Sequence, residues 1–110
     1  MSGYYESADL KKFADIARVN KELGEKFFDY YGNVLSDGAL SEREKSLIAL
    51  AVAHALKCPY CIDAYTQACM EKGADEQQMN EAVHVAAAMA AGITLVHGVQ
   101  MMNKVDELML

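Results

Sequence analysis

The chain has 110 residues, enough to bury the core of one domain, and no linker rich in Pro, Gly or Ser divides it, so we expect a single domain over residues 1–110. Its 16 acidic and 10 basic residues give a formal net charge of −6, and no basic cluster exceeds Lys11-Lys12, which argues against nucleic acid as a partner. The N-terminus lacks an apolar signal segment, and the apolar run at residues 47–56 is too short to span a bilayer. We therefore expect a cytoplasmic protein with no membrane partner.

Apolar residues recur at helical spacing from end to end, while no stretch alternates polar and apolar residues for long. This pattern predicts an all-α fold of about six helices. Ser7 is the expected N-cap of the first helix, which ends near residue 19, and Asn20 is the expected N-cap of the second helix. Phe27, Phe28 and Tyr31 belong to the apolar residues that the second helix carries.

The best local signal is a capping box. Ser41 followed by Glu44 predicts a third helix that begins there and runs through Leu56. Pro59, the only proline in the chain, disfavours the helical conformation at the residue before it but suits the first position of a new helix. We therefore expect a break at residues 57–58 and a fourth helix from Pro59.

The C-terminal third divides into two predicted helices. The fourth helix should end near Lys72, with Gly73 as its left-handed C′ residue, and Asp75 should cap a fifth helix over residues 76–91. Gly92 is expected to loosen or break the helical pattern before a sixth helix runs toward the C-terminus.

The motif that carries chemistry is CPYC at residues 58–61. Cys58 is placed as the N-cap of the fourth helix and Cys61 in its first turn, where unpaired backbone N–H groups and the helix dipole lower a thiol pKa toward neutrality. Thiols at positions i and i+3 can close a disulfide after small adjustments. The pattern indicates a redox centre.

Three other interpretations of the cysteines compete with the redox centre. Two cysteines in an Ala-rich helical protein can be buried small side chains. His54, Cys58, Cys61 and Cys69 could supply four metal ligands, although His54 lies across the predicted break and Cys69 lies more than two turns beyond Cys61. CPYC also occurs in glutaredoxins, but there the motif follows a strand and here it follows a helix.

A longer segment, residues 42–98, resembles the alkylhydroperoxidase D/carboxymuconolactone decarboxylase family. The shared features are the helix EKSLIALAVA, the C-x-x-C, a Glu-containing helix after the Gly-Ala turn, and a small-residue helix that ends near a histidine. The N-terminal stretch YYESADLKKFADI and the wording CPYCIDAYTQAC are most similar to the short subgroup described as arsenosugar-biosynthesis-associated peroxidase-like proteins.

The resemblance implies an all-helical subunit that assembles into homotrimers or homohexamers. In the peroxidase members the second cysteine attacks the peroxide and the first forms the disulfide, which carries these roles to Cys61 and Cys58. Helix geometry alone would favour Cys58, the more N-terminal thiol. A thiol reductant protein resets the pair, and no flavin, nicotinamide or haem motif indicates a cofactor.

The sequence departs from the peroxidase members at the proton relay. A glutamate twelve residues before the first cysteine and a histidine four residues after the second are replaced by Ser46 and Tyr65. Tyr65 is a candidate hydrogen-bond donor to a thiolate or a peroxide oxygen, or else a packing residue. His54, one turn before Cys58, is the nearest alternative base, or else a satisfied core histidine.

The leading functional hypothesis is a cysteine-based peroxidase or thiol–disulfide oxidoreductase that reduces a hydroperoxide. One alternative is the lactone decarboxylase activity of the family, which does not use cysteine redox chemistry. The other is a non-enzymatic or weakly active protein that binds a small molecule or a soft metalloid at its vicinal thiols.

Overall fold

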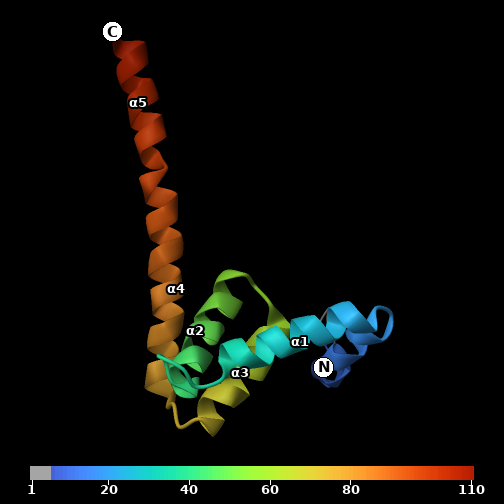
Figure 1. Cartoon of the computed structure of the whole chain (residues 1–110). Coiled ribbons are helices and arrows are strands. Elements are labelled where there is room, and N and C mark those ends of the chain that lie inside the picture. The colour runs from blue at the N-terminus through green and yellow to red at the C-terminus, as the bar shows by residue number, and fades with distance from the viewer. Residues whose placement is uncertain (1–5) are drawn as a thin grey trace.

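The computed structural model describes residues 6–110, and every regular element in this range is helical, which confirms the predicted all-α class (Figure 1). In chain order the elements are a 3₁₀ helix η1 (Ser7–Arg18) and five α-helices: α1 (Lys21–Leu35), α2 (Glu42–Ala55), α3 (Pro59–Glu71), α4 (Glu76–Val96) and α5 (Gly98–Met109).

The start of η1 differs from the prediction. Its N-cap is Glu6, with no side-chain cap, so the assignment of Ser7 as N-cap is wrong. The Ser7 hydroxyl instead donates to Oδ2 of Asp63 on α3, at 2.6 Å, and a hydrogen bond to an ionised carboxylate is stronger than one between neutral groups. The cap of α1 is confirmed, since Oδ1 of Asn20 accepts the N–H of Leu23 at 3.1 Å. Ser7 therefore ties η1 to α3.

The two ends of α2 follow the sequence signals. The capping box is complete: Ser41 Oγ accepts the N–H of Glu44 at 3.1 Å, and Oε1 of Glu44 accepts the N–H of Ser41 at 2.8 Å. At the other end Lys57 adopts the left-handed conformation (φ 57°), and the N–H of Cys58 donates to the carbonyl of Ala53. This is a Schellman ending, and it confirms the break before Pro59.

The turn between α3 and α4 repeats this ending. Gly73 is left-handed (φ +87°), as predicted, and the N–H of Ala74 donates to the carbonyl of Cys69 at 2.9 Å. Asp75 is the N-cap of α4, as predicted. The expected break at Gly92 is wrong, because α4 continues through it to Val96. A glycine costs about 1 kcal/mol relative to alanine in a helix, which the flanking alanines outweigh.

The core lies where α2 packs against α3 and α4. Leu50, Ala53, Cys69 and Ala74 are its buried apolar residues, and Ser46 is also buried. The rest of α4 continues with α5 as a long rod that leaves this body, so the molecule extends 61 Å in one direction against 37 and 36 Å in the others (Figure 1).

The rod is apolar and unburied. Among residues 6–110, the helical span Glu76–Met109 is long and apolar enough to cross a membrane by length and composition, with a mean hydropathy of 1.7 in its most apolar window. The span was not predicted from the sequence, because Gly92 was expected to divide it. None of that window is buried.

Candidate functional site

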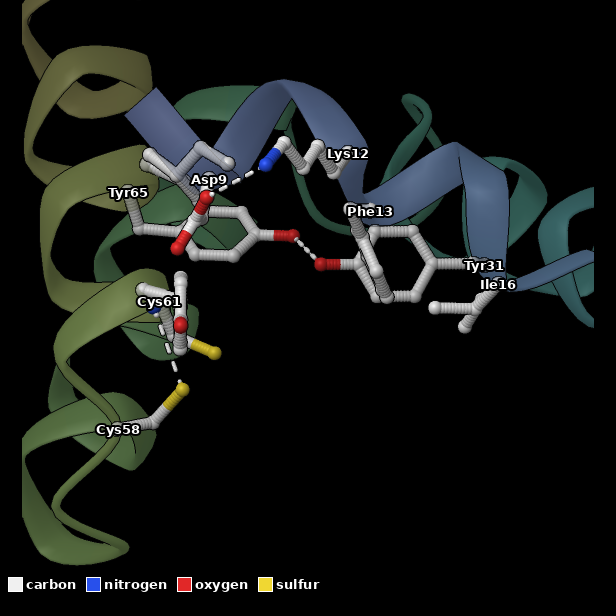
Figure 2. Close-up of a pocket in the computed structure, with 11 residues that line it drawn as sticks. Asp9, Lys12, Phe13, Ile16, Tyr31, Cys58, Cys61 and Tyr65 are labelled. Carbon is white, nitrogen blue, oxygen red and sulfur yellow. Dashed lines mark hydrogen bonds and ion pairs between the residues drawn. The ribbon is translucent and has the colours of Figure 1, made fainter. Parts of the chain in front are cut away.

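The two motif cysteines lie at a cavity of about 610 Å³ between η1 and the start of α3. Its lining comes from three elements: η1 supplies five residues, α1 supplies Tyr31, and the start of α3 supplies the remainder, including both motif cysteines and Tyr65. Leu10, Phe13 and Ile16 make the η1 wall largely apolar. Figure 2 shows the thiols and the tyrosine hydroxyls facing the same cavity.

Packing against aromatic residues of α1 holds the η1 wall in place. Phe13 contacts Phe27, Phe28 and Tyr31 edge to face, with ring centroids 5.1 to 6.3 Å apart. Gly24 approaches Ala17 so closely that any Cβ at position 24 would overlap it. The aromatic face of α1 therefore positions the residues of η1 over the thiols.

The positions of the thiols agree with the sequence analysis. Cys58 is the N-cap of α3, and its Sγ accepts the backbone N–H of Cys61 at 3.3 Å (Figure 2). Both cysteines are free thiols and partly buried. They lie one helical turn apart at the same end of α3, so disulfide formation needs only small movements.

The protonation state of Cys61 differs from the expected one. Burial raises the pKa of its thiol to about 11, and the hydrogen bond and charge of Cys58 act in the same direction. The hydrogen bond of its own backbone N–H lowers the pKa, but by less. Desolvation in the apolar cavity thus outweighs the helix N-terminus. Cys61 is a protonated thiol at neutral pH.

A pair of tyrosine hydroxyls completes the site. Tyr31 on α1 and Tyr65 on α3 share a hydrogen bond between their hydroxyl oxygens (Figure 2). Burial raises the pKa of Tyr65, and so do its hydrogen bond to Tyr31 and the nearby ionisable groups of Tyr31 and Cys61. Tyr65 is therefore a neutral phenol. Tyr31 was not a candidate from the sequence, because its partner lies 34 residues away.

The structure places the other candidate residues away from the cavity. His54 is on α2, where its Nδ1 lies 2.8 Å from the carbonyl of Leu50, and it is not among the residues that line the thiol cavity. Cys69 is fully buried in the α2–α3–α4 core. The four possible metal ligands are not brought together: no cluster of three or more His, Cys, Asp or Glu that could hold a metal occurs in residues 6–110.

A second, smaller cavity of about 220 Å³ reaches the thiols from the side of α1 and α2. It shares Tyr31, Cys58, Cys61 and Tyr65 with the larger cavity, and its other lining residues are almost all apolar. These four side chains therefore separate two apolar spaces, and the thiols are approached from both.

The model of the carboxymuconolactone decarboxylase family matches residues 21–104. The chain belongs to this family. It is 36% identical over 94 residues to "Uncharacterized protein 4 in cox locus" of Paracoccus denitrificans, covering 86% of this chain and 85% of that protein.

A solved structure supports the fold of this family member. The crystal structure of a protein from Methanobacterium thermoautotrophicum superimposes with a TM-score of 0.74 and 31% identity, over 78% of this chain and 97% of that one. The region matched by the family model begins at residue 21, after η1 has ended at Arg18. One wall of the thiol cavity is thus built by a segment outside the matched region.

Proposed function

We propose that this family member is a thiol peroxidase that reduces an apolar organic hydroperoxide at the Cys58–Cys61 pair. The observation that carries the proposal is the position of two free thiols, one helical turn apart, at a largely apolar cavity of about 610 Å³. A cavity of this size accommodates a small organic molecule. The apolar wall of η1 favours a hydroperoxide with an alkyl or aryl group over hydrogen peroxide.

The reaction follows from the thiol pair. The thiolate of Cys61 attacks the terminal oxygen of the hydroperoxide, the O–O bond breaks, and the products are a sulfenic acid on Cys61 and an alcohol. Cys58 then condenses with the sulfenic acid to give a disulfide and water. An external dithiol protein reduces the disulfide and is itself oxidised. The attacking role of Cys61 rests on the family resemblance.

Assembly is part of the proposal, and its partner is a second copy of this chain. Residues 82–103 contain no Asp, Glu, Lys or Arg, and every large apolar side chain from Val85 to Leu110 is at least half exposed. An isolated apolar rod of this kind is not stable in water without a partner. His84, His97 and Gln100 lie within the run, and polar groups of this kind suit a helix contact better than a lipid core. Copies of the rod therefore pack together, as a trimer or hexamer in a cytoplasmic protein.

A second candidate function is binding of a soft metalloid by the vicinal thiols. The raised pKa of Cys61 is the observation that favours it, because a protonated thiol is a slow nucleophile toward peroxides. Arsenic(III)-type species bind thiol pairs by their softness. In this case the two sulfurs would act as ligands and no turnover would occur.

The test is the rate of disulfide formation when reduced protein meets cumene hydroperoxide, followed by mass spectrometry. Wild type should react faster than a free thiol and form the Cys58–Cys61 disulfide. Cys58→Ser should accumulate sulfenic acid on Cys61, whereas Cys61→Ser should lose the reaction. Cys69→Ala, which removes the buried third thiol, is the matched control.

The wild-type rate also decides between the two functions. If wild type reacts no faster than a free thiol, the peroxidase proposal fails. Stoichiometric binding of phenylarsine oxide by wild type, lost in both Cys58→Ser and Cys61→Ser, would then support the metalloid function.

A further inference from the structure

We infer that Tyr65 is the catalytic acid of this site: its phenol protonates the alkoxide that leaves when the peroxide O–O bond breaks, and Tyr31 positions it. The inference rests on the proposed peroxidase function and identifies the group that protonates the leaving oxygen. It also supplies a donor at one of the two positions where the peroxidase relay residues are replaced.

The placement of the two hydroxyls supports this role. Tyr65 lies four residues after Cys61 on α3, so both side chains project from the same face of the helix. Tyr31 reaches the same place from α1, and the two hydroxyls share a hydrogen bond. In Figure 2 this pair lies beside the thiols, at the cavity that a substrate would enter.

When a peroxide binds between the thiol and the phenol, its two oxygens contact different groups. The sulfur of Cys61 faces the terminal oxygen, and the hydroxyl of Tyr65 is available to the oxygen that carries the organic group. A tyrosine hydroxyl has one proton and two acceptor positions. Tyr65 can therefore accept a hydrogen bond from Tyr31 while it donates its own proton to the substrate.

The environment keeps the phenol in the form that this role requires. Burial raises the pKa of Tyr65, so the phenol keeps its proton at neutral pH. A phenol is nevertheless a stronger acid than an alcohol, so proton transfer to an alkoxide is downhill. Lys12 is a poorer donor, because its ammonium group is exposed and paired with Asp9 at 3.2 Å.

The step balances in protons and electrons. Cys61 loses its proton to water, and the resulting thiolate forms a bond to the terminal oxygen of ROOH. The electron pair of the O–O bond leaves with RO⁻, which takes the proton of Tyr65 and becomes ROH. The tyrosinate, stabilised by the hydrogen bond from Tyr31, regains a proton from water. One thiol and one hydroperoxide give one sulfenic acid and one alcohol.

The test compares two oxidants whose leaving groups differ in basicity. The alkoxide from tert-butyl hydroperoxide needs a proton, whereas the acetate from peracetic acid does not. We expect Tyr65→Phe to lower the second-order rate constant with tert-butyl hydroperoxide by about 10²-fold or more, the usual contribution of a general acid. With peracetic acid the same variant should react within about threefold of wild type, because no general acid is required.

Two further variants distinguish a role in positioning Tyr65 from general damage to the structure. Tyr31→Phe should lower the rate with tert-butyl hydroperoxide by less than Tyr65→Phe and leave the rate with peracetic acid unchanged. Thr66→Val removes a hydroxyl from the neighbouring position of α3, which donates to the carbonyl of Ile62 and lines neither cavity, and should match wild type with both oxidants.

The outcomes distinguish the failure of this inference from the failure of the proposed function. Equal losses with both oxidants in Tyr65→Phe would mean a structural role and would overturn the inference alone. Unchanged rates with both oxidants would also overturn it. A wild type that reacts with neither oxidant faster than a free thiol would overturn the peroxidase function and the inference with it.

Discussion

The Sγ of Cys58 accepts the backbone N–H of Cys61 at 3.3 Å, and the side chain of Cys58 also raises the pKa of the Cys61 thiol. One residue thus begins the helix that carries the site and holds its neighbour protonated. Burial is the larger cause of the raised pKa, and Cys58 adds to it.

Replacing Cys58 with serine should lower the pKa of Cys61 from about 11. Serine is an effective N-cap, so α3 keeps its start, while the thiol that raises the pKa of Cys61 is gone. Burial remains, so the pKa should stay above the ordinary value. The measurement is the pH dependence of alkylation of Cys61 by iodoacetamide, read by mass spectrometry. An unchanged pKa would show that Cys58 contributes nothing to it, and a higher pKa would show that Cys58 lowers it.

The rate of peroxide reduction should rise with pH instead of levelling off near neutrality. Because the Cys61 pKa is about 11, the thiolate fraction grows about tenfold per pH unit below it, and the rate constant for attack should grow with it. Stopped-flow kinetics of wild type between pH 6 and about pH 9 would measure this slope. A plateau that begins near pH 7 would contradict a pKa of about 11 for the Cys61 thiol.

Adding a methyl group at Gly24 should loosen η1. A Cβ at this position overlaps Ala17, so Gly24→Ala must push η1 away from α1, at a cost of about 1 to 3 kcal/mol. Gly32→Ala is the matched control on the same helix, where a Cβ meets nothing within 4 Å and alanine should stabilise by up to about 1 kcal/mol. Urea denaturation and limited proteolysis of η1 would report both effects. Equal stabilisation by both alanines would show that η1 does not depend on this contact.

Most of the helix ends could be predicted from the sequence, because each capping signal acts within a few residues of the end that it marks. Ser41 with Glu44, Pro59 and Gly73 each marked a boundary that the structure confirms. The prediction for Ser7 failed because its hydroxyl finds Asp63, 56 residues away.

The candidate site shows the same division between local and distant information. The helix-start positions of Cys58 and Cys61 follow from the spacing around the proline, and both were predicted. The partner of Tyr65 and the raised pKa of Cys61 depend on how α1 and η1 fold over α3, and no pattern within one helix reports that arrangement.

The backbone at Lys57 predicts a stabilising substitution. Lys57 is left-handed without being a glycine, which costs about 1 kcal/mol, so Lys57→Gly should raise the free energy of unfolding by about that amount. The reverse change at the matching turn, Gly73→Ala, should lower it by a similar amount, because φ is +87° and no atom lies close enough to clash. Urea denaturation of the two variants measures both values. A loss of stability in Lys57→Gly would mean that the lysine side chain contributes a contact.

If copies of the α4–α5 rod pack together as proposed, a charge in the middle of the rod should dissociate them. Ile93 is 55% exposed within an uncharged run of residues 82–103, so it would be buried if copies of the rod pack together. Ile93→Glu would then bury an unpaired carboxylate, which costs several kcal/mol per subunit. Light scattering should give an oligomeric mass for wild type and a monomeric mass for Ile93→Glu. Asn103→Glu, at the polar end of the run, is the control and should remain oligomeric. A monomeric wild type that sediments with phosphatidylcholine vesicles would contradict self-association and assign the rod to a lipid surface.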